Sequence, residues 1–153
     1  RLHHVHVQAV EDLRVLRLGG FLHDLGKLSV PDPVLLKPGP LTEEEWVSMK
    51  EHPVTGERLC QPLHSLDAVR SGIRHHHERW NGSGYPDGLA GDAIPLTAQV
   101  LGMVDVYDAL ITRRSYKPPF TREESMEILE KEGARDLWNP KLLPEFLRLV
   151  REQ

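Results

Sequence analysis

The chain has 153 residues, of which 39% are hydrophobic and 27% are charged, and its formal net charge is −4. This length suits one domain over residues 1–153 with a core that needs no disulfide, and no apolar run approaches the roughly 20 residues that cross a bilayer. A negative net charge argues against an extended nucleic-acid groove, which needs a basic face. It allows a small phosphorylated ligand held by a local cluster of positive charge.

The cysteine content and the first residue bear on compartment and completeness. Cys60 is the single cysteine, so no internal disulfide can form, and no secretory signal precedes the body of the chain. We therefore expect a cytoplasmic protein. The first residue is Arg1 rather than methionine, and we expect the chain to be a fragment of a longer protein.

The first predicted helix ends beside a His-Asp pair. Apolar residues recur at helical spacing from Val10 to Leu25, and Gly26 ends this pattern. A helix here delivers His23 and Asp24 at its C-terminal end. The segment 31–40 is rich in proline and glycine and is predicted to be a loop.

A capping box predicts the next helix. The Thr42 side chain can cap the first amides while Glu45 reaches back, so a helix should begin there and carry His52 near its end. Pro53 should interrupt it, and residues 54–60 should continue as a further helix. The segment 65–75 has helical apolar spacing and presents a pair of histidines, His76 and His77, where it ends.

The second half of the chain also reads as helices. The segment 81–88 is too rich in glycine and proline for regular structure, and a helix that carries Asp105 should follow Pro95. Thr121 begins a second capping box, and Asn139 should cap the last helix, which Pro140 starts. No segment shows sustained strand alternation, so the predicted fold class is all-α, a helical bundle.

Imidazoles and carboxylates recur at the predicted helix ends. An isolated histidine is most often a surface or hydrogen-bonded residue, and we interpret His64 and His75 in this way. The others form a combination that is harder to dismiss, because a helical bundle can gather side chains from several helices around metals, and these are ligands that iron, manganese and zinc accept. The candidate ligands are His23, Asp24, His52, His76, His77 and Asp105.

Several blocks of sequence closely resemble the HD-GYP family of HD phosphohydrolases, whose members hydrolyse the bacterial second messenger cyclic di-GMP. The resemblance spans residues 13–150. Its most specific part is the block from His76-His77-Glu78 to Gly84-Tyr85-Pro86. It rests on these segments: His23-Asp24-Leu25-Gly26-Lys27, Leu36-Lys37-Pro38-Gly39, Lys50-Glu51-His52-Pro53, residues 76–89 and residues 104–110.

The resemblance implies an HD-type helical bundle with a phosphodiesterase site that yields linear pGpG, GMP or both. It implies two divalent metal ions, iron or manganese, held by the six candidate ligands, with Asp24 as the carboxylate that bridges them. It also implies that Lys27 contacts the substrate phosphate, that Arg114 and Lys117 grip the nucleotide phosphates, and that Tyr85 lies in the signature loop Gly84-Tyr85-Pro86 beside the site. Ser115 stands where the family usually has proline, a loop change that leaves both basic charges available.

The chemistry of such a site agrees with the implied roles. Two metals can polarise a phosphodiester and lower the pKa of a water molecule, while Lys27, Arg114 and Lys117 would stabilise negative charge on the phosphate. Both roles have simpler alternatives. The basic residues near position 114 could form a solvated surface, and Tyr85 could serve only to pack the loop.

The N-terminus departs from the family pattern. The family has a further histidine on a helix well before the His-Asp pair, whereas here only His3, His4 and His6 precede it, without the usual motif and with too few residues between. We expect either an incomplete N-terminal helix or a deletion between these histidines and Val10, and we leave His6 unassigned.

Three hypotheses of function follow. The first is a cyclic di-GMP phosphodiesterase, and the second is a catalytically impaired module that binds cyclic di-GMP or a signalling protein. The third is an HD phosphohydrolase of another nucleotide, against which the Gly84-Tyr85-Pro86 block argues. The resemblance further suggests an upstream sensory or receiver domain, and contact with a second copy or a signalling protein through this block.

Overall fold

The structure is a computed structural model that describes residues 2–113 and 118–152, with side chains described from residue 11 onward. Its elements in chain order are α1 (Leu2–Leu22), η1 (Leu25–Ser29), α2 (Asp32–Leu35), α3 (Glu43–Lys50), α4 (His52–Cys60), η2 (His64–Leu66), α5 (Asp67–His75), η3 (Gly91–Ala93), α6 (Leu96–Ile111), α7 (Arg122–Gly133) and α8 (Leu142–Arg151), where η marks a 3₁₀ turn. All regular structure in these residues is helical, which confirms the predicted all-α fold.

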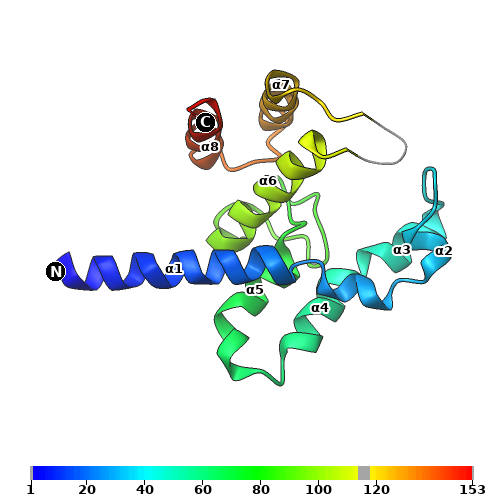
Figure 1. The fold of residues 1–153 in the computed structure, drawn as a ribbon, viewed down its shortest axis with the longest axis horizontal. Coiled ribbons are helices and arrows are strands. Elements are labelled where there is room, and N and C mark those ends of the chain that lie inside the picture. Colours follow the sequence, from blue (N-terminus) through cyan, green and yellow to red (C-terminus); the bar gives the residue numbers. More distant parts are fainter. Residues whose placement is uncertain (1, 114–117, 153) are drawn as a thin grey trace.

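The helices pack around two apolar clusters. The first cluster joins α1, α4 and α5 through Val15, Cys60, Val69 and Ile73. The second joins α6, α7 and α8 and contains Met103, Leu129, Trp138, Leu143 and Leu147. Helix α6 contacts α1 and α5 on one side and α7 on the other, so it connects the two clusters (Figure 1).

Both predicted capping boxes are confirmed. The Glu45 amide donates to Thr42 Oγ1 at 3.3 Å, and the Thr42 amide donates to Glu45 Oε2 at 2.7 Å. At α7 the corresponding distances between Thr121 and Glu124 are 3.1 and 2.8 Å. These motifs are local in sequence, so each helix start follows directly from the residues there.

The predicted position of His52 was wrong. His52 begins α4 instead of lying near the end of the preceding helix, which stops at Lys50. Pro53 lies in the first turn of α4, where its missing amide hydrogen costs no helical hydrogen bond. Proline therefore starts this helix and does not interrupt one.

Other boundaries differ by a few residues. The Pro-rich loop contains the short helix α2, and α1 begins at Leu2, well before Val10. The predicted start of the last helix at Pro140, capped by Asn139, was wrong. The helix begins at Leu142, and the side chain of Asn139 accepts the amide of Lys141 at 2.9 Å in a turn that precedes it. Among the described residues, no helix is long and apolar enough to span a membrane.

Candidate metal centre

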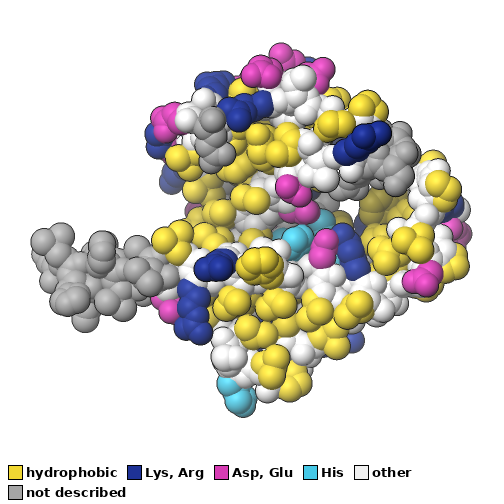
Figure 2. All heavy atoms as spheres, in the orientation of Figure 1, with side chains coloured by type: hydrophobic (Ala, Val, Ile, Leu, Met, Phe, Trp, Pro, Cys, Tyr) yellow, Lys and Arg dark blue, Asp and Glu magenta, His cyan; other side chains and the backbone are white. Residues whose placement is uncertain are grey.

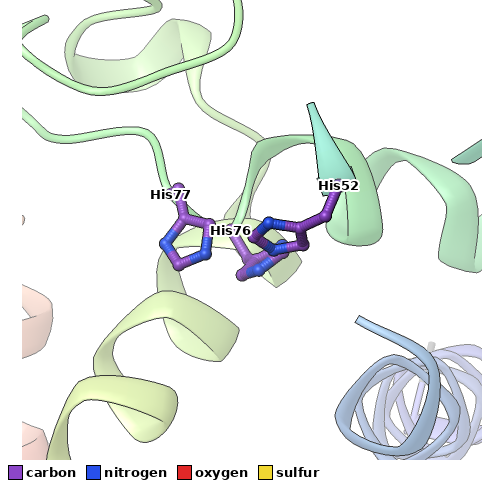
Figure 3. Close-up of side chains that lie close together, drawn as sticks. All are labelled: His52, His76 and His77. Carbon is purple, nitrogen blue, oxygen red and sulfur yellow. The ribbon is translucent and has the colours of Figure 1, made fainter. Parts of the chain in front are cut away.

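Four helix segments bring the predicted ligands together. His23 and Asp24 follow α1, His52 begins α4, His76 follows α5 directly, and Asp105 lies on α6. Figure 3 shows the rings of His52, His76 and His77 grouped together, with ring centroids 4.1 to 5.5 Å apart. The centroids of His23 and His76 are 5.1 Å apart, so His76 belongs to both sides of the cluster.

A backbone carbonyl fixes the orientation of three of these imidazoles. The Nδ1 atoms of His23, His52 and His76 lie 2.9, 2.7 and 2.7 Å from the carbonyl oxygens of Gly20, Met49 and Ile73. A carbonyl oxygen can only accept, so Nδ1 carries the proton in each ring. Nε2 then presents its lone pair to the centre of the cluster, which is the arrangement found for histidines that bind metals.

The Nε2 atoms themselves lack partners. In His23, His52 and His76 this atom is buried and has no hydrogen-bond partner among the described residues. A buried polar atom without a partner costs about 1–3 kcal/mol, so three in one place call for a ligand. Ligand atoms of His52, His76 and His77, and separately of His23, Asp24 and His76, lie within 4.8 Å of one another, and the donor set fits divalent metal ions.

Two carboxylates complete the cluster. The two oxygens of Asp24 lie 3.5 Å from His23 Nε2 and 3.5 Å from His52 Nε2, and Asp105 Oδ1 lies 3.6 Å from His23 Nε2. Two atoms that bind one ion at about 2.1 Å each are at most about 4.2 Å apart, so these separations are compatible with shared ions. Asp24 has one oxygen toward each side of the cluster, as a bridging carboxylate would.

Burial keeps most of the imidazoles neutral. Desolvation lowers the pKa of His52, lowers the pKa of His76 to about 4, and lowers that of His77 to about 2. Protonated neighbouring imidazoles would add to the effect for His76 and His77. Neutral imidazole is the form that binds a metal, so no proton competes at these residues near pH 7.

His23 and Asp105 form a contrasting pair. Burial lowers the pKa of His23, but the carboxylates of Asp105 and Asp24 outweigh this effect, and the pKa is raised. Burial would raise the pKa of Asp105, yet the His23 imidazole beside it brings that pKa down to about 2. Asp105 therefore stays ionised and can neutralise a cation.

Glycines let the ligand-bearing backbones approach closely. A Cβ on Gly26 would overlap the carbonyl oxygen of His52, and a Cβ on Gly102 would overlap that of His76. Gly84 packs in the same way against the backbone of residues 77–79. Neighbouring elements thus touch through their main chains beside His52, His76 and His77, and this close approach leaves no room for a side chain between them.

The signature loop is tied to the histidine pair. Buried Glu78 accepts the amides of Asp87 and Leu89 at 2.8 and 3.0 Å, and Tyr85 stacks on His77 with centroids 4.8 Å apart. Burial raises the pKa of Tyr85 to about 12, so its hydroxyl keeps its proton. The predicted location of this loop beside the site agrees with the structure.

A cavity of about 640 Å³ opens from the cluster, and His52, His77, Tyr85 and Asp105 line its inner end. Lys27 also lines it, with Nζ 2.7 Å from Asp24 Oδ2. Residues that the sequence interpretation missed line the outer part: Val34, Leu35, Lys37, Leu41, Trp46 and Met49. A signal was present, because residues 46 and 49 share one face of a helix, but their distance from the histidines depends on the tertiary fold.

Two predicted residues and the unassigned His6 are not placed at the site. Arg114 and Lys117 lie outside the described residues. Helix α1 is continuous from Leu2 to Leu22, and at 1.5 Å per residue its backbone puts residue 6 about 25 Å from His23. The backbone of α1 thus carries residue 6 away from the cluster, toward the free N-terminal end of the helix (Figure 1).

Comparison with known proteins identifies the family. The sequence model of the HD domain matches residues 5–142. The chain belongs to the HD domain family. HD domain phosphohydrolases bind divalent metals, and the His-rich cluster is a potential metal site of this kind.

Two curated relatives are similar over most of this chain. The cyclic di-GMP phosphodiesterase response regulator RpfG of Xanthomonas campestris is 42% identical over 145 residues, which are 90% of this chain and 37% of the relative. The 3'3'-cGAMP-specific phosphodiesterase 2 of Vibrio cholerae is 40% identical over 149 residues, which are 96% of this chain and 28% of the relative. The chain thus spans about a third of the length of these relatives.

A solved structure shares the fold. Bd1817, a HDG"Y"P protein from Bdellovibrio bacteriovorus, superposes with a TM-score of 0.71 and 21% sequence identity, over 97% of this chain and 47% of that protein. This likeness shows the fold alone. The HD domain match and the relatives named as cyclic di-GMP phosphodiesterases confirm the predicted resemblance to the HD-GYP family.

Proposed function

We propose that this chain is a metal-dependent phosphodiesterase that hydrolyses cyclic di-GMP to linear pGpG, GMP or both. The observation that carries the proposal is the set of three buried Nε2 atoms that lack hydrogen-bond partners among the described residues and face two carboxylates at one end of a cavity. The names of several relatives that are about 40% identical support the substrate.

The metal ligands in this proposal are His23, Asp24, His52, His76, His77 and Asp105, and the ions are two divalent metals, iron or manganese. When bound, they would supply Lewis-acid polarisation of the phosphodiester and lower the pKa of the attacking water. Six ligand side chains could hold two ions. Each neutral imidazole can give its Nε2 lone pair to one ion, whereas the two oxygens of Asp24 lie toward His23 and His52, which supports Asp24 as the ligand that the ions would share.

The remaining residues orient the substrate and neutralise its charge. Lys27 already pairs with Asp24 at the cavity wall, from where its ammonium can contact a phosphate oxygen. The hydroxyl of Tyr85 stays protonated and can donate a hydrogen bond to the same group. Arg114 and Lys117 remain proposed phosphate contacts on the strength of the sequence resemblance.

The test is turnover of cyclic di-GMP by the manganese- or iron-loaded protein, purified without oxygen. We expect His23→Ala and Asp24→Ala to lower turnover at least a hundredfold, while His64→Ala, whose side chain is 95% exposed, retains it. Absence of turnover in the loaded wild-type protein would refute the proposal, as would full activity of the Asp24 variant.

A second substrate is favoured by a specific observation. The 3'3'-cGAMP-specific relative is 40% identical over almost the whole chain, so this chain has a relative for each cyclic dinucleotide. Comparing kcat/KM for cyclic di-GMP and 3'3'-cGAMP decides which is preferred.

The non-catalytic candidate is an impaired module that binds cyclic di-GMP without hydrolysing it. Calorimetry with cyclic di-GMP tests this candidate, because a lack of affinity would exclude it.

The organisation of the whole protein is also a proposal. We propose that residues 1–153 are one domain of a longer cytoplasmic signalling protein, behind a sensory or receiver domain. Contact with a second copy, or with a signalling protein through Gly84-Tyr85-Pro86, remains part of the proposal. Hydrodynamic measurements on the full-length protein test the oligomeric state.

A further inference from the structure

Helix α3 carries a large aromatic side chain that the core does not use. No residue of α3 is buried, and neither apolar cluster includes Trp46, which is 45% exposed. Trp46 and Met49 instead line the outer part of the cavity that begins at the histidine cluster. Packing therefore does not account for an indole at this position.

The wall that carries Trp46 is held in place. Lys37 Nζ lies 2.6 Å from Glu45 Oε2, and the same oxygen accepts the Thr42 amide of the α3 capping box at 2.7 Å. The connecting loop contains Pro38 and Pro40, which restrict its backbone. Since Lys37 is already paired with a carboxylate, its role here is to fix the loop to α3. A wall that is ordered before binding costs less entropy when a ligand arrives.

The two ends of the cavity differ in chemistry. His52, His77, Asp105 and Lys27 form the inner end, whereas Leu41, Trp46 and Met49 form an apolar surface at the outer end. Figure 2 shows imidazole side chains at the bottom of the hollow and hydrophobic side chains on the α2–α3 side. Such a cavity fits a ligand that has a phosphate at one end and a flat apolar group at the other.

We propose that Trp46 stacks on a purine base of the bound nucleotide while the phosphate of this nucleotide lies at the histidine cluster. The inference rests on the proposed function for the kind of ligand and adds the residue that recognises the base. Met49 and Leu41 flank the base. Stacking of a base on an aromatic side chain changes affinity by a factor of about 5 to 150.

The experiment compares two ligands that differ only by the base. Calorimetry on the metal-loaded protein gives dissociation constants for GMP and for ribose 5-phosphate. In the wild type we expect GMP to bind more tightly, and in Trp46→Ala we expect the affinity ratio to fall at least fivefold, with ribose 5-phosphate nearly unaffected. Trp46→Phe, which keeps an aromatic ring, should recover part of the ratio.

A neighbouring residue provides the control. Val47 lies on the same helix, is 64% exposed and does not line the cavity, so Val47→Ala should leave the ratio unchanged. An unchanged ratio in Trp46→Ala, or an equal ratio loss in Val47→Ala, would overturn the inference.

The binding measurement is independent of hydrolysis. If Trp46→Ala loses the base preference but the wild-type protein does not hydrolyse cyclic di-GMP, the role of Trp46 in base binding is supported and the phosphodiesterase proposal is refuted. If the wild-type protein hydrolyses cyclic di-GMP but Trp46→Ala keeps the base preference, the phosphodiesterase proposal is supported and the role of Trp46 is refuted.

Discussion

At the scale of single residues, the pairing of Asp87 shows how the signature loop is attached to α5. Arg74 donates to both oxygens of Asp87, at 2.7 and 2.8 Å, and Nε2 of His75 lies 2.9 Å from Asp87 Oδ2. The Arg74 guanidinium brings the pKa of Asp87 from 3.8 to about 2. The same guanidinium also reaches Glu57 of α4 at 3.1 Å, so one arginine joins two helices and the loop.

This pairing predicts a pH-dependent stability. Because the folded pKa is lower than the unfolded one, the unfolded state binds more protons between pH 3.8 and about 2, so the contribution of Asp87 is present above this range and is lost as pH falls through it. We expect Asp87→Asn to lower the free energy of unfolding at pH 6, and the difference from wild type to shrink at pH 3. Urea unfolding at both values measures this. A difference that stays constant with pH would contradict it.

At the scale of elements, two glycines in helices should respond to alanine with opposite signs. A Cβ on Gly102 of α6 would meet the His76 carbonyl oxygen, whereas nothing lies within 4 Å of a Cβ on Gly20 of α1. Alanine favours a helix over glycine by about 1 kcal/mol, but overpacking costs about 1–3 kcal/mol.

We therefore expect Gly20→Ala to raise the free energy of unfolding by up to about 1 kcal/mol and Gly102→Ala to lower it. The second variant should also weaken metal binding, because His76 must move. Denaturant unfolding and metal titration of both variants provide the measurement. Stabilisation by Gly102→Ala would show that the backbone of His76 leaves room for a Cβ at residue 102.

The elements also show how far the sequence leads. The two capping boxes and the end of α5 beside a histidine pair were predicted correctly, because each depends on residues a few positions apart. Helix α1 ends at Leu22, three residues before the predicted Leu25, and still delivers His23 and Asp24. The start of α4 at His52 was predicted wrongly, because proline can begin a helix as well as end one. Trp46 was missed as a cavity residue because its distance from the histidines depends on the tertiary fold, on which periodicity carries no information.

At the scale of the whole molecule, metal binding should stabilise the fold. A ligand that binds only the folded state at a hundred times its dissociation constant adds about 2.7 kcal/mol, which corresponds to about 5–10 °C in Tm for a protein of this size. We expect manganese to raise Tm by this amount over protein in EDTA, and Asp24→Ala to abolish most of the increase. Thermal unfolding followed by circular dichroism measures both. An equal increase in the Asp24 variant would place the ion elsewhere.

The candidate ligands come from both halves of the bundle. His23, His52 and His76 are attached to α1, α4 and α5 around the first apolar cluster, whereas Asp105 lies on α6, whose Met103 belongs to the second. Ions held by these residues would connect the two halves of the bundle. Amide hydrogens in α7 and α8, which contribute none of the candidate ligands, would then exchange with solvent more slowly in the metal-loaded protein. Metal binding would thus stabilise helices that do not contact the ions.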